Sequence, residues 1–189
     1  MSARGAAFRP LPLAKVYQLI EPGPVVLLTT ARKGRGKSAA VPNVMTMSWH
    51  MMVEFEPPAI ACVVSGANHS FAALQASGEC VIAIPARKLA RQVVAVGNSS
   101  GADIDKFQSF GLTPLPAAQV QAPLIAECFA NLECRVADRR MVPSRNLFLL
   151  EVVQAWIDPR QKNPKTIHHR GYGVFAVDGA TIKLKSRMR

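Results

Sequence analysis

The sequence predicts a mainly β protein of one domain, an antiparallel barrel with short helices added to it. Three observations support this prediction. Short apolar and β-branched runs recur between turn-forming residues, only a few stretches have helical spacing, and strands do not alternate regularly with helices. A length of 189 residues suits one domain spanning 1–189, with residues 1–23 as an N-terminal arm because prolines interrupt them.

Three strands are predicted in the first third of the chain. Residues 24–31 are a short β-rich run, residues 32–37 a basic turn, and residues 38–53 are again extended, so the two runs can pair as a hairpin. The Glu-Pro-Pro sequence at 56–58 ends this element, because proline cannot donate to a sheet ladder. Residues 59–65 follow as a third strand, with the continuous apolar character of a buried one.

Short helices are expected in the middle of the chain. Residues 70–78 predict one, with Ser70 as N-cap and Gly78 in the C-terminal capping position. Residues 79–85 then predict a strand. Residues 86–97 predict a second helix, since apolar side chains recur at helical spacing; these are Leu89, Val93 and Val96. A polar loop leads into a third short helix, whose first turn suits Asp103.

The last third of the chain returns to strands. Residues 126–138 and 146–158 are two long strand candidates, separated by a turn-like segment at 139–145. Near the C-terminus, Asp178-Gly179 lies between two alternating runs and predicts a hairpin over 172–186.

Composition indicates a folded protein with a core of small and aliphatic side chains. Hydrophobic residues make up 49% of the chain and aromatic ones only 6%. No apolar run approaches the ~20 residues that span a bilayer, and prolines interrupt the region where a signal peptide needs a continuous apolar segment. We therefore expect a soluble, cytoplasmic protein. The four cysteines include no Cys-x-x-Cys pair and are expected to be reduced and buried.

The net charge of +11 indicates that the protein attracts anions. Nucleic acid, an anionic membrane and a phosphate-bearing cofactor all suit that charge, so specific sites must decide between them. Lys and Arg are spread over the whole chain, and its two tyrosines and two tryptophans form no stacking pattern with them. We therefore expect neither a nucleic-acid partner nor a membrane partner.

Familiar catalytic motifs are absent or incomplete in the sequence. Gly36-Lys37-Ser38 imitates the end of a phosphate-binding loop, but Ala31 stands where that motif needs its first glycine, and Pro42 opposes the helix that must follow. A basic hairpin turn explains this segment better. No serine lies in a Gly-x-Ser-x-Gly elbow, and the adjacent His168 and His169 would point apart on a strand, which disfavours a metal site.

One strand carries two small hydroxyls on a single face. In Asn-Val-Met-Thr-Met-Ser-Trp-His-Met, residues 43–51, the odd positions are mostly large and apolar and are expected to face the barrel core, whereas Thr46 and Ser48 share the other face. Hydroxyls at that spacing, about 6.5 to 7 Å, can donate to a phosphate or a polyol. An ordinary half-exposed strand explains the same pattern, and His50 has no assigned role.

Several motifs follow one another in an order that resembles a known family. They are "NVMTMSW", "PPAIACVVS", "GECVIAIP", "SSGADIDKFQSFGLT" and "APLIAECFANLECRV". Together they resemble the flavin reductase-like family of FMN-binding split barrels, and especially its flavoredoxin-like branch. The resemblance runs from about Pro24 to the terminal "KLKSRM". It implies a six-stranded antiparallel Greek-key split barrel, usually a homodimer, that binds FMN near the subunit interface.

The resemblance also implies a set of cofactor-binding residues. Thr46 and Ser48 would line the flavin and its ribityl-phosphate tail, and the segment 68–70 would meet the phosphate at a helix N-terminus. Alternatively, Ser70 only caps its helix and Lys106 is a solvated charge. The implied cofactor-binding residues are Asn43, Met45, Thr46, Met47, Ser48, Trp49, Ser65, Asn68, His69, Ser70, Ser100, Gly101 and Lys106.

Two departures from the family pattern bear on function. His69 stands where relatives can carry arginine, which would weaken a charged contact near neutral pH. Ser144-Arg145-Asn146 stands where relatives that use NADH tend to have Gly-Asp-His, which puts direct nicotinamide-dependent flavin reduction in doubt. The expected function is an FMN oxidoreductase that passes electrons from NADH or NADPH through the flavin to an acceptor, with no catalytic side chain. The alternative is an electron carrier without a nicotinamide site that docks on a redox partner protein.

Overall fold

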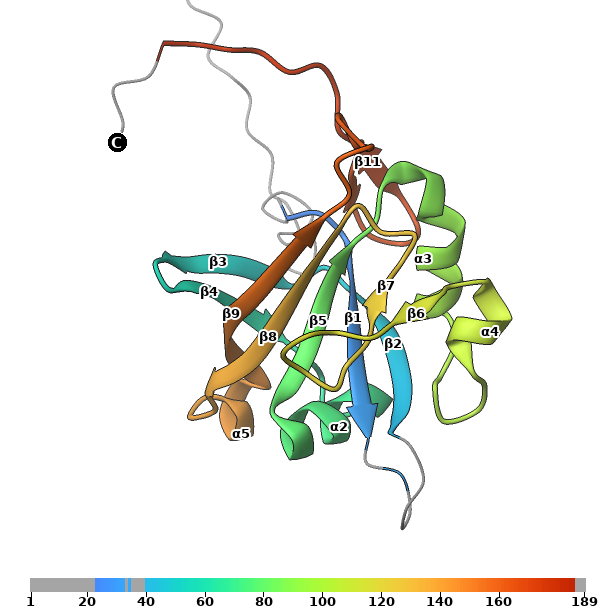
Figure 1. Cartoon of the computed structure of the whole chain (residues 1–189), viewed down its shortest axis with the longest axis vertical. Helices are drawn as coiled ribbons and strands as arrows, with labels where there is room; N and C mark the ends of the chain where they lie inside the picture. Colours follow the sequence, from blue (N-terminus) through green and yellow to red (C-terminus); the bar gives the residue numbers. More distant parts are fainter. Residues whose placement is uncertain (1–22, 33, 35–39, 186–189) are drawn as a thin grey trace, which may run out of the picture.

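A curved antiparallel sheet of seven strands forms the body of the molecule (Figure 1). The computed structural model describes residues 23–32, 34 and 40–185. The strands run in the order β2-β1-β5-β8-β9-β4-β3. Their bounds are β1 (Val26–Arg32), β2 (Val41–Met47), β3 (His50–Phe55), β4 (Pro58–Val63), β5 (Glu79–Ile84), β8 (Ala130–Asp138) and β9 (Leu147–Ile157). The prediction of a mainly β, antiparallel architecture is confirmed.

The two edge strands of this sheet are consecutive in the chain. β2 ends at Met47 and β3 begins at His50, so Ser48 and Trp49 carry the chain from one edge of the sheet to the other. The sheet must therefore curl on itself, and the backbone N–H of Val63 donates to the Trp49 carbonyl at 3.0 Å across the gap. This break turns the predicted extended run at 38–53 into two strands, which is why the sheet has seven strands and not six.

Short helices and small strand pairs cover the ends and one face of the sheet. The helical elements are α2 (His69–Ser77), η2 (Arg87–Leu89), α3 (Ala90–Gly97), α4 (Lys106–Phe110) and α5 (Val142–Arg145). The small strands are β6 (Pro114–Leu115) with β7 (Leu124–Ile125), and β10 (Ile167–His169) with β11 (Phe175–Val177). Within the described residues, no helix is long and apolar enough to cross a membrane.

The ends of the helices confirm one predicted cap and correct two other predictions. Gly78 ends α2 in the left-handed conformation, with φ 70°, and its N–H donates to the Leu74 carbonyl, as predicted. Ser70, however, is not the N-cap, because the helix begins one residue earlier and Asn68 occupies that position. Asp103 was expected in the first turn of the next helix but lies before it, and Asp105 caps α4 by accepting from the Gln108 N–H.

Strand β1 is buried on both faces and separates two layers of core. Val26 and Leu28 face the barrel interior, whereas Val25 and Leu27 pack under α3 and α4. The η2 and α3 side chains predicted from helical spacing join the second layer; they are Leu89, Val93 and Val96. This double burial explains why β1 reads as a continuous apolar run.

The four cysteines are buried and unpaired, as predicted; they are Cys62, Cys80, Cys128 and Cys134. Burial raises the pKa of Cys62 and Cys128 to about 12, so these thiols stay protonated near neutral pH. Cys80 and Cys134 stand opposite each other on β5 and β8. They contribute to the barrel core as small apolar groups.

The C-terminal hairpin lies earlier in the chain than predicted. β10 pairs with β11, and the turn between them contains Gly171 and Gly173, both with positive φ. No strand follows residue 177 in the described residues, so the predicted turn at Asp178-Gly179 is wrong. Asp178 instead accepts from the Thr166 hydroxyl at 2.6 Å and lies 3.0 Å from Nε2 of His168. Those contacts lower the pKa of Asp178.

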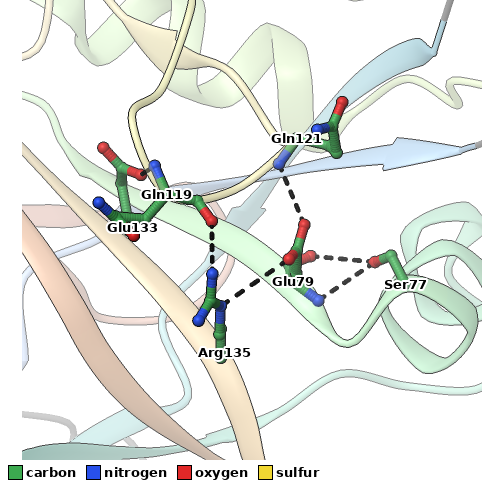
Figure 2. A network of polar contacts seen from close by, with 6 residues as sticks. All are labelled: Ser77, Glu79, Gln119, Gln121, Glu133 and Arg135. Atoms are coloured by element: carbon green, nitrogen blue, oxygen red, sulfur yellow. Dashed lines mark hydrogen bonds and ion pairs between the residues drawn. The ribbon is translucent and has the colours of Figure 1, made fainter.

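Glu133 is fully buried and anchors the loop between β6 and β7 to β8. Its carboxylate accepts from the backbone N–H groups of Ala118 and Gln119 and from Nε1 of Trp156. Figure 2 shows the adjoining contacts, in which Arg135 donates to the Gln119 carbonyl and lies against Glu79. Burial opposes ionisation of Glu133, but the hydrogen bonds outweigh it and lower the pKa of this carboxyl.

Candidate functional site

Three hollows follow the outer edge of β2 and the turn after it. The loop hollow, of about 270 Å³, is lined by Met45, Thr46, Met47, Ser48, Trp49, Val63, Ser65 and Asn68. The hairpin hollow, of about 290 Å³, is lined by Val25, Thr46, Ser48, Val93, Val94, Gly97, Asn98, His169, Gly173 and Phe175. The edge hollow, of about 120 Å³, is lined by Thr30, Arg32, Val41, Pro42, Asn43, His69, Ala73, Gly101 and Ala102.

Thr46 and Ser48 line both larger hollows. The Thr46 hydroxyl donates to the Val93 carbonyl at 2.6 Å, so its proton is used by α3 and its oxygen can only accept from a ligand. Within the described residues Ser48 makes no side-chain hydrogen bond, so its hydroxyl can donate. Thr46 and Ser48 thus share a face as predicted, but toward a ligand Thr46 can only accept a hydrogen bond whereas Ser48 can also donate one.

The large side chains of the same stretch divide between core and surface. Met47 is buried in the barrel core and Met45 packs against it, as predicted. Trp49 is 57% exposed and Met51 64% exposed, so the prediction that they face the core is wrong. The strand ends at Met47, and beyond that point the alternation no longer continues into the barrel. His50, for which the sequence indicated no role, contacts the Pro24 carbonyl through Nε2 at 2.8 Å.

Asn43 and Ser70 form the framework of the edge hollow. The Asn43 amide donates to the Ser70 hydroxyl at 2.8 Å, which joins β2 to the first turn of α2. A Cβ at Gly101 would collide with Oδ1 of Asn43, so only glycine fits where the 98–101 loop crosses β2. These three predicted site residues therefore shape the hollow, and Asn43 already uses one amide donor to do so.

Thr30 is an unsatisfied polar group in the edge hollow. It pairs with Asn43 across β1 and β2, and it is fully buried. Its hydroxyl is the one buried side-chain polar atom of the described residues that has no hydrogen-bond partner. Such an atom costs free energy unless a ligand satisfies it. Arg32 and His69 line the same hollow, so it combines an orphan donor with basic side chains.

Lys106 lines none of the three hollows. Its side chain is buried, and Nζ donates to the Val96 carbonyl at 2.9 Å. That carbonyl belongs to the last turn of α3, where the helix dipole favours a cation. Burial lowers the pKa of Lys106. The charge therefore stabilises the end of α3 and the loop that follows it. That loop includes Ser100, whose hydroxyl accepts from the Ala102 N–H at 3.2 Å.

The remaining predicted residues lie at the start of α2. Ser65 and Asn68 line the loop hollow, and His69 lines the edge hollow. No side chain caps α2. Asn146, the last residue of the Ser-Arg-Asn segment, adjoins this region, since its carbonyl accepts from the Val64 N–H at 3.0 Å. It has a left-handed backbone with φ 55°.

Sequence reasoning missed several residues of the site. Thr30 and Arg32 were assigned only to a strand and a turn, although two adjacent threonines in an apolar run are a visible anomaly. The α3 and hairpin residues of the hairpin hollow carried no local signal, because tertiary packing alone brings them to β2. They are Val93, Val94, Gly97, Asn98, His169, Gly173 and Phe175.

Comparisons with known proteins agree on one family. Residues 20–176 match the model of the flavin reductase like domain. The Escherichia coli K12 protein YddH is 31% identical over 187 residues, which cover 93% of this chain and 97% of that protein. A protein of Archaeoglobus fulgidus is 31% identical over 138 residues, or 70% of this chain and 78% of that one.

Solved structures agree with this fold. The FMN-binding domain of a flavin reductases-like enzyme from Shewanella baltica OS155 superposes with a TM-score of 0.76 at 25% identity, covering 93% of this chain and 96% of that one. Flavoredoxin of Desulfovibrio vulgaris (Miyazaki F) gives a TM-score of 0.75 at 22% identity, covering 97% of both chains. The chain therefore belongs to the flavin reductase-like family and has its FMN-binding split-barrel fold.

Proposed function

We propose that this chain binds FMN along β2 and acts as an oxidoreductase that passes electrons from NADH or NADPH through the flavin to an acceptor. The observation that carries the proposal is the edge hollow, which is lined by Thr30, whose hydroxyl has no partner, and by the basic side chains of Arg32 and His69. A phosphate there would satisfy the hydroxyl and suit the net charge of +11. The solved relative from Shewanella baltica is itself FMN-binding, which supports the same cofactor here.

The dimensions of β2 suit an extended FMN. Asn43 and Ser48 are five residues apart, which is about 16 Å along a strand. With the phosphate in the edge hollow, the ribityl chain would run along β2 from Asn43 to Thr46. The ring would then lie at Thr46 and Ser48, which line both larger hollows. The flavin supplies the redox chemistry when bound, and the chain supplies binding and orientation.

FMN is expected to stabilise the purified protein and to colour it yellow. A ligand that binds only the folded state raises the free energy of unfolding by about 2.7 kcal/mol at one hundred times its Kd. The measurement is the melting temperature with and without FMN, alongside the absorption spectrum; riboflavin, which lacks the phosphate, is the control. A colourless protein whose melting temperature does not change with FMN would contradict the proposal. An equal rise in melting temperature with riboflavin would show that the phosphate does not contribute to binding.

A second candidate function is an electron carrier without a nicotinamide site. Asn146 favours it, because the element next to the loop hollow carries Ser-Arg-Asn and has no histidine. Anaerobic mixing of the FMN-loaded protein with NADH or NADPH separates the two candidates. Rapid bleaching of the flavin absorbance is expected of the oxidoreductase, and failure to bleach at a useful rate would leave the carrier.

We also propose that the chain is a homodimer. Figure 1 shows β3 and β4 projecting from the rest of the sheet, and β3 is an edge strand. Its exposed apolar side chains are Met51, Met52, Val53 and Phe55, the last of them 90% exposed. An exposed apolar edge of this kind is typical of an interface. Sedimentation at the mass of one chain, with FMN present, would contradict the dimer.

A further inference from the structure

A basic surface lies at the beginning of the α3 segment. η2 and the first turn of α3 carry Arg87, Lys88 and Arg91, all exposed. The Arg87 N–H donates to the Lys165 carbonyl at 2.6 Å, so the segment that carries Lys162 and Lys165 runs against it. These five residues are called the basic surface below.

The cations of the basic surface stand where a helix disfavours them. The N-terminal end of a helix carries a partial positive charge, and neither η2 nor α3 has an acidic residue in its first turn. Among the described residues, Arg87, Lys88 and Arg91 make no ion pair. Glu127 lies close enough to act on the same thiol as Lys88, but its carboxylate accepts from the Thr113 N–H.

Other exposed arginines show the contrast. Arg140 and Arg160 each pair with an aspartate two residues earlier in the chain, at 2.6 and 2.8 Å. The basic surface has no such local compensation, and its members repel one another and the helix dipole. Carboxylates from outside the chain would relieve both costs, which distinguishes this surface from an ordinary solvated charged face.

The basic surface is continuous with the hairpin hollow along two segments. On α3, Val94 follows Arg91 on the same side of the helix, about 4.5 Å along its axis, and lines the hollow. On the other segment, Lys165 leads within four residues to His169, which lines the same hollow. A protein held at the basic surface would therefore stand beside the place where the flavin ring is expected.

We propose that the basic surface docks an acidic electron-carrier protein next to the flavin. The inference rests on the proposed function for its redox purpose, but docking itself needs only the charges described. Cations on two separate segments present a surface and not a single anion pocket, which suits a patch of carboxylates on a folded partner. Electrostatic complementarity of this kind speeds encounter and is weakened by salt.

Plant-type ferredoxin, an acidic electron carrier, is the probe, and cytochrome c is its basic counterpart. The variants are Lys88→Glu with Arg91→Glu, and a control of equal charge change, Lys183→Glu with Lys185→Glu, at exposed positions of the segment that follows β11. Dissociation constants are measured at low and at physiological salt. We expect ferredoxin to bind the wild type, salt to weaken it, and the first variant to bind at least about tenfold more weakly. The control variant should stay within about twofold of the wild type.

Each other outcome would overturn the proposal. Equal losses of ferredoxin affinity in both variants would mean that only the net charge of the protein matters. Binding of cytochrome c as tight as that of ferredoxin would contradict a preference for an acidic partner. Loss of NADPH affinity in the Lys88→Glu, Arg91→Glu variant, with ferredoxin unaffected, would make the surface a dinucleotide site. The Lys88→Glu, Arg91→Glu variant places carboxylates at a helix N-terminus, so its melting temperature is not expected to fall. A melting temperature at or above that of the wild type excludes misfolding as the cause of weaker binding. FMN binding is measured separately, so its failure and the failure of docking are distinguishable.

Discussion

Replacement of Glu133 by Gln is expected to lower the free energy of unfolding by about 3 kcal/mol, because hydrogen bonds to a buried charged group contribute about 1.5–3 kcal/mol each. Ala118 N–H and Trp156 Nε1 donate to one carboxylate oxygen and the Gln119 N–H donates to the other. Glutamine removes the charge from all three bonds and places an amide nitrogen, which cannot accept, against one oxygen's donors. Urea unfolding measures the change. Glu151→Gln, on the exposed side of β9, is the matched control and should change stability by less than about 0.5 kcal/mol.

The same substitution should change the response to acid. The pKa of Glu133 in the folded state is below its ordinary value of 4.5, so between those two values the unfolded state binds more protons. The stabilisation is therefore present above about pH 4.5 and is lost as the pH falls through the folded pKa. The difference in stability between wild type and Glu133→Gln should shrink below that pH. A constant difference down to about pH 3 would show that the charge is not what holds the loop.

Thr30→Val is expected to stabilise the FMN-free protein while weakening its affinity for FMN. An unsatisfied buried polar group costs about 1–3 kcal/mol, and valine has the same shape without the hydroxyl, so unfolding should require about 1 kcal/mol more. Loss of a donor to the phosphate should raise the Kd of FMN about tenfold, since 1.4 kcal/mol corresponds to a factor of ten. Thermal or urea unfolding and a fluorescence titration of FMN measure the two effects.

The neighbouring threonine supplies the control. Thr29 points to the other face of β1, and its hydroxyl donates to the Pro123 carbonyl at 2.6 Å. Thr29→Val should therefore lower stability by about 1 kcal/mol and leave the Kd of FMN unchanged. Opposite signs for the two adjacent substitutions are the result that supports a phosphate at Thr30. If Thr30→Val destabilises the protein or leaves FMN affinity intact, the edge hollow is not the phosphate site.

The local elements were predictable because their periodicity is a property of the chain. Burial predicts strand β1, helical spacing predicts the buried side chains of η2 and α3 at 89, 93 and 96, and the left-handed φ predicts the glycine at the end of α2. The order of motifs also predicted the family. The shared face of Thr46 and Ser48 was predictable too, since residues two apart on a strand point the same way.

What the sequence could not show is which partner each polar group finds. Thr46 and Ser70 read alike as candidate ligand contacts, yet one donates to α3 and the other accepts from Asn43. Lys106, a candidate charge near the flavin, donates to the Val96 carbonyl at the end of α3. These hydrogen bonds join residues 10 to 47 positions apart, and no local pattern encodes which of them will form.

The sequence alone determined a β-rich chain, its helix faces, its buried thiols and its membership of a flavin-binding family. Tertiary structure alone decided that β2 breaks at Ser48, that the hairpin at 167–177 reaches β2, and that Thr30 is left without a partner. Periodicity depends on neighbours in the chain, so it is readable from the sequence. Closure of the sheet depends on contacts between distant strands, and only that closure places the hydroxyls, the cations and the hollows at one edge.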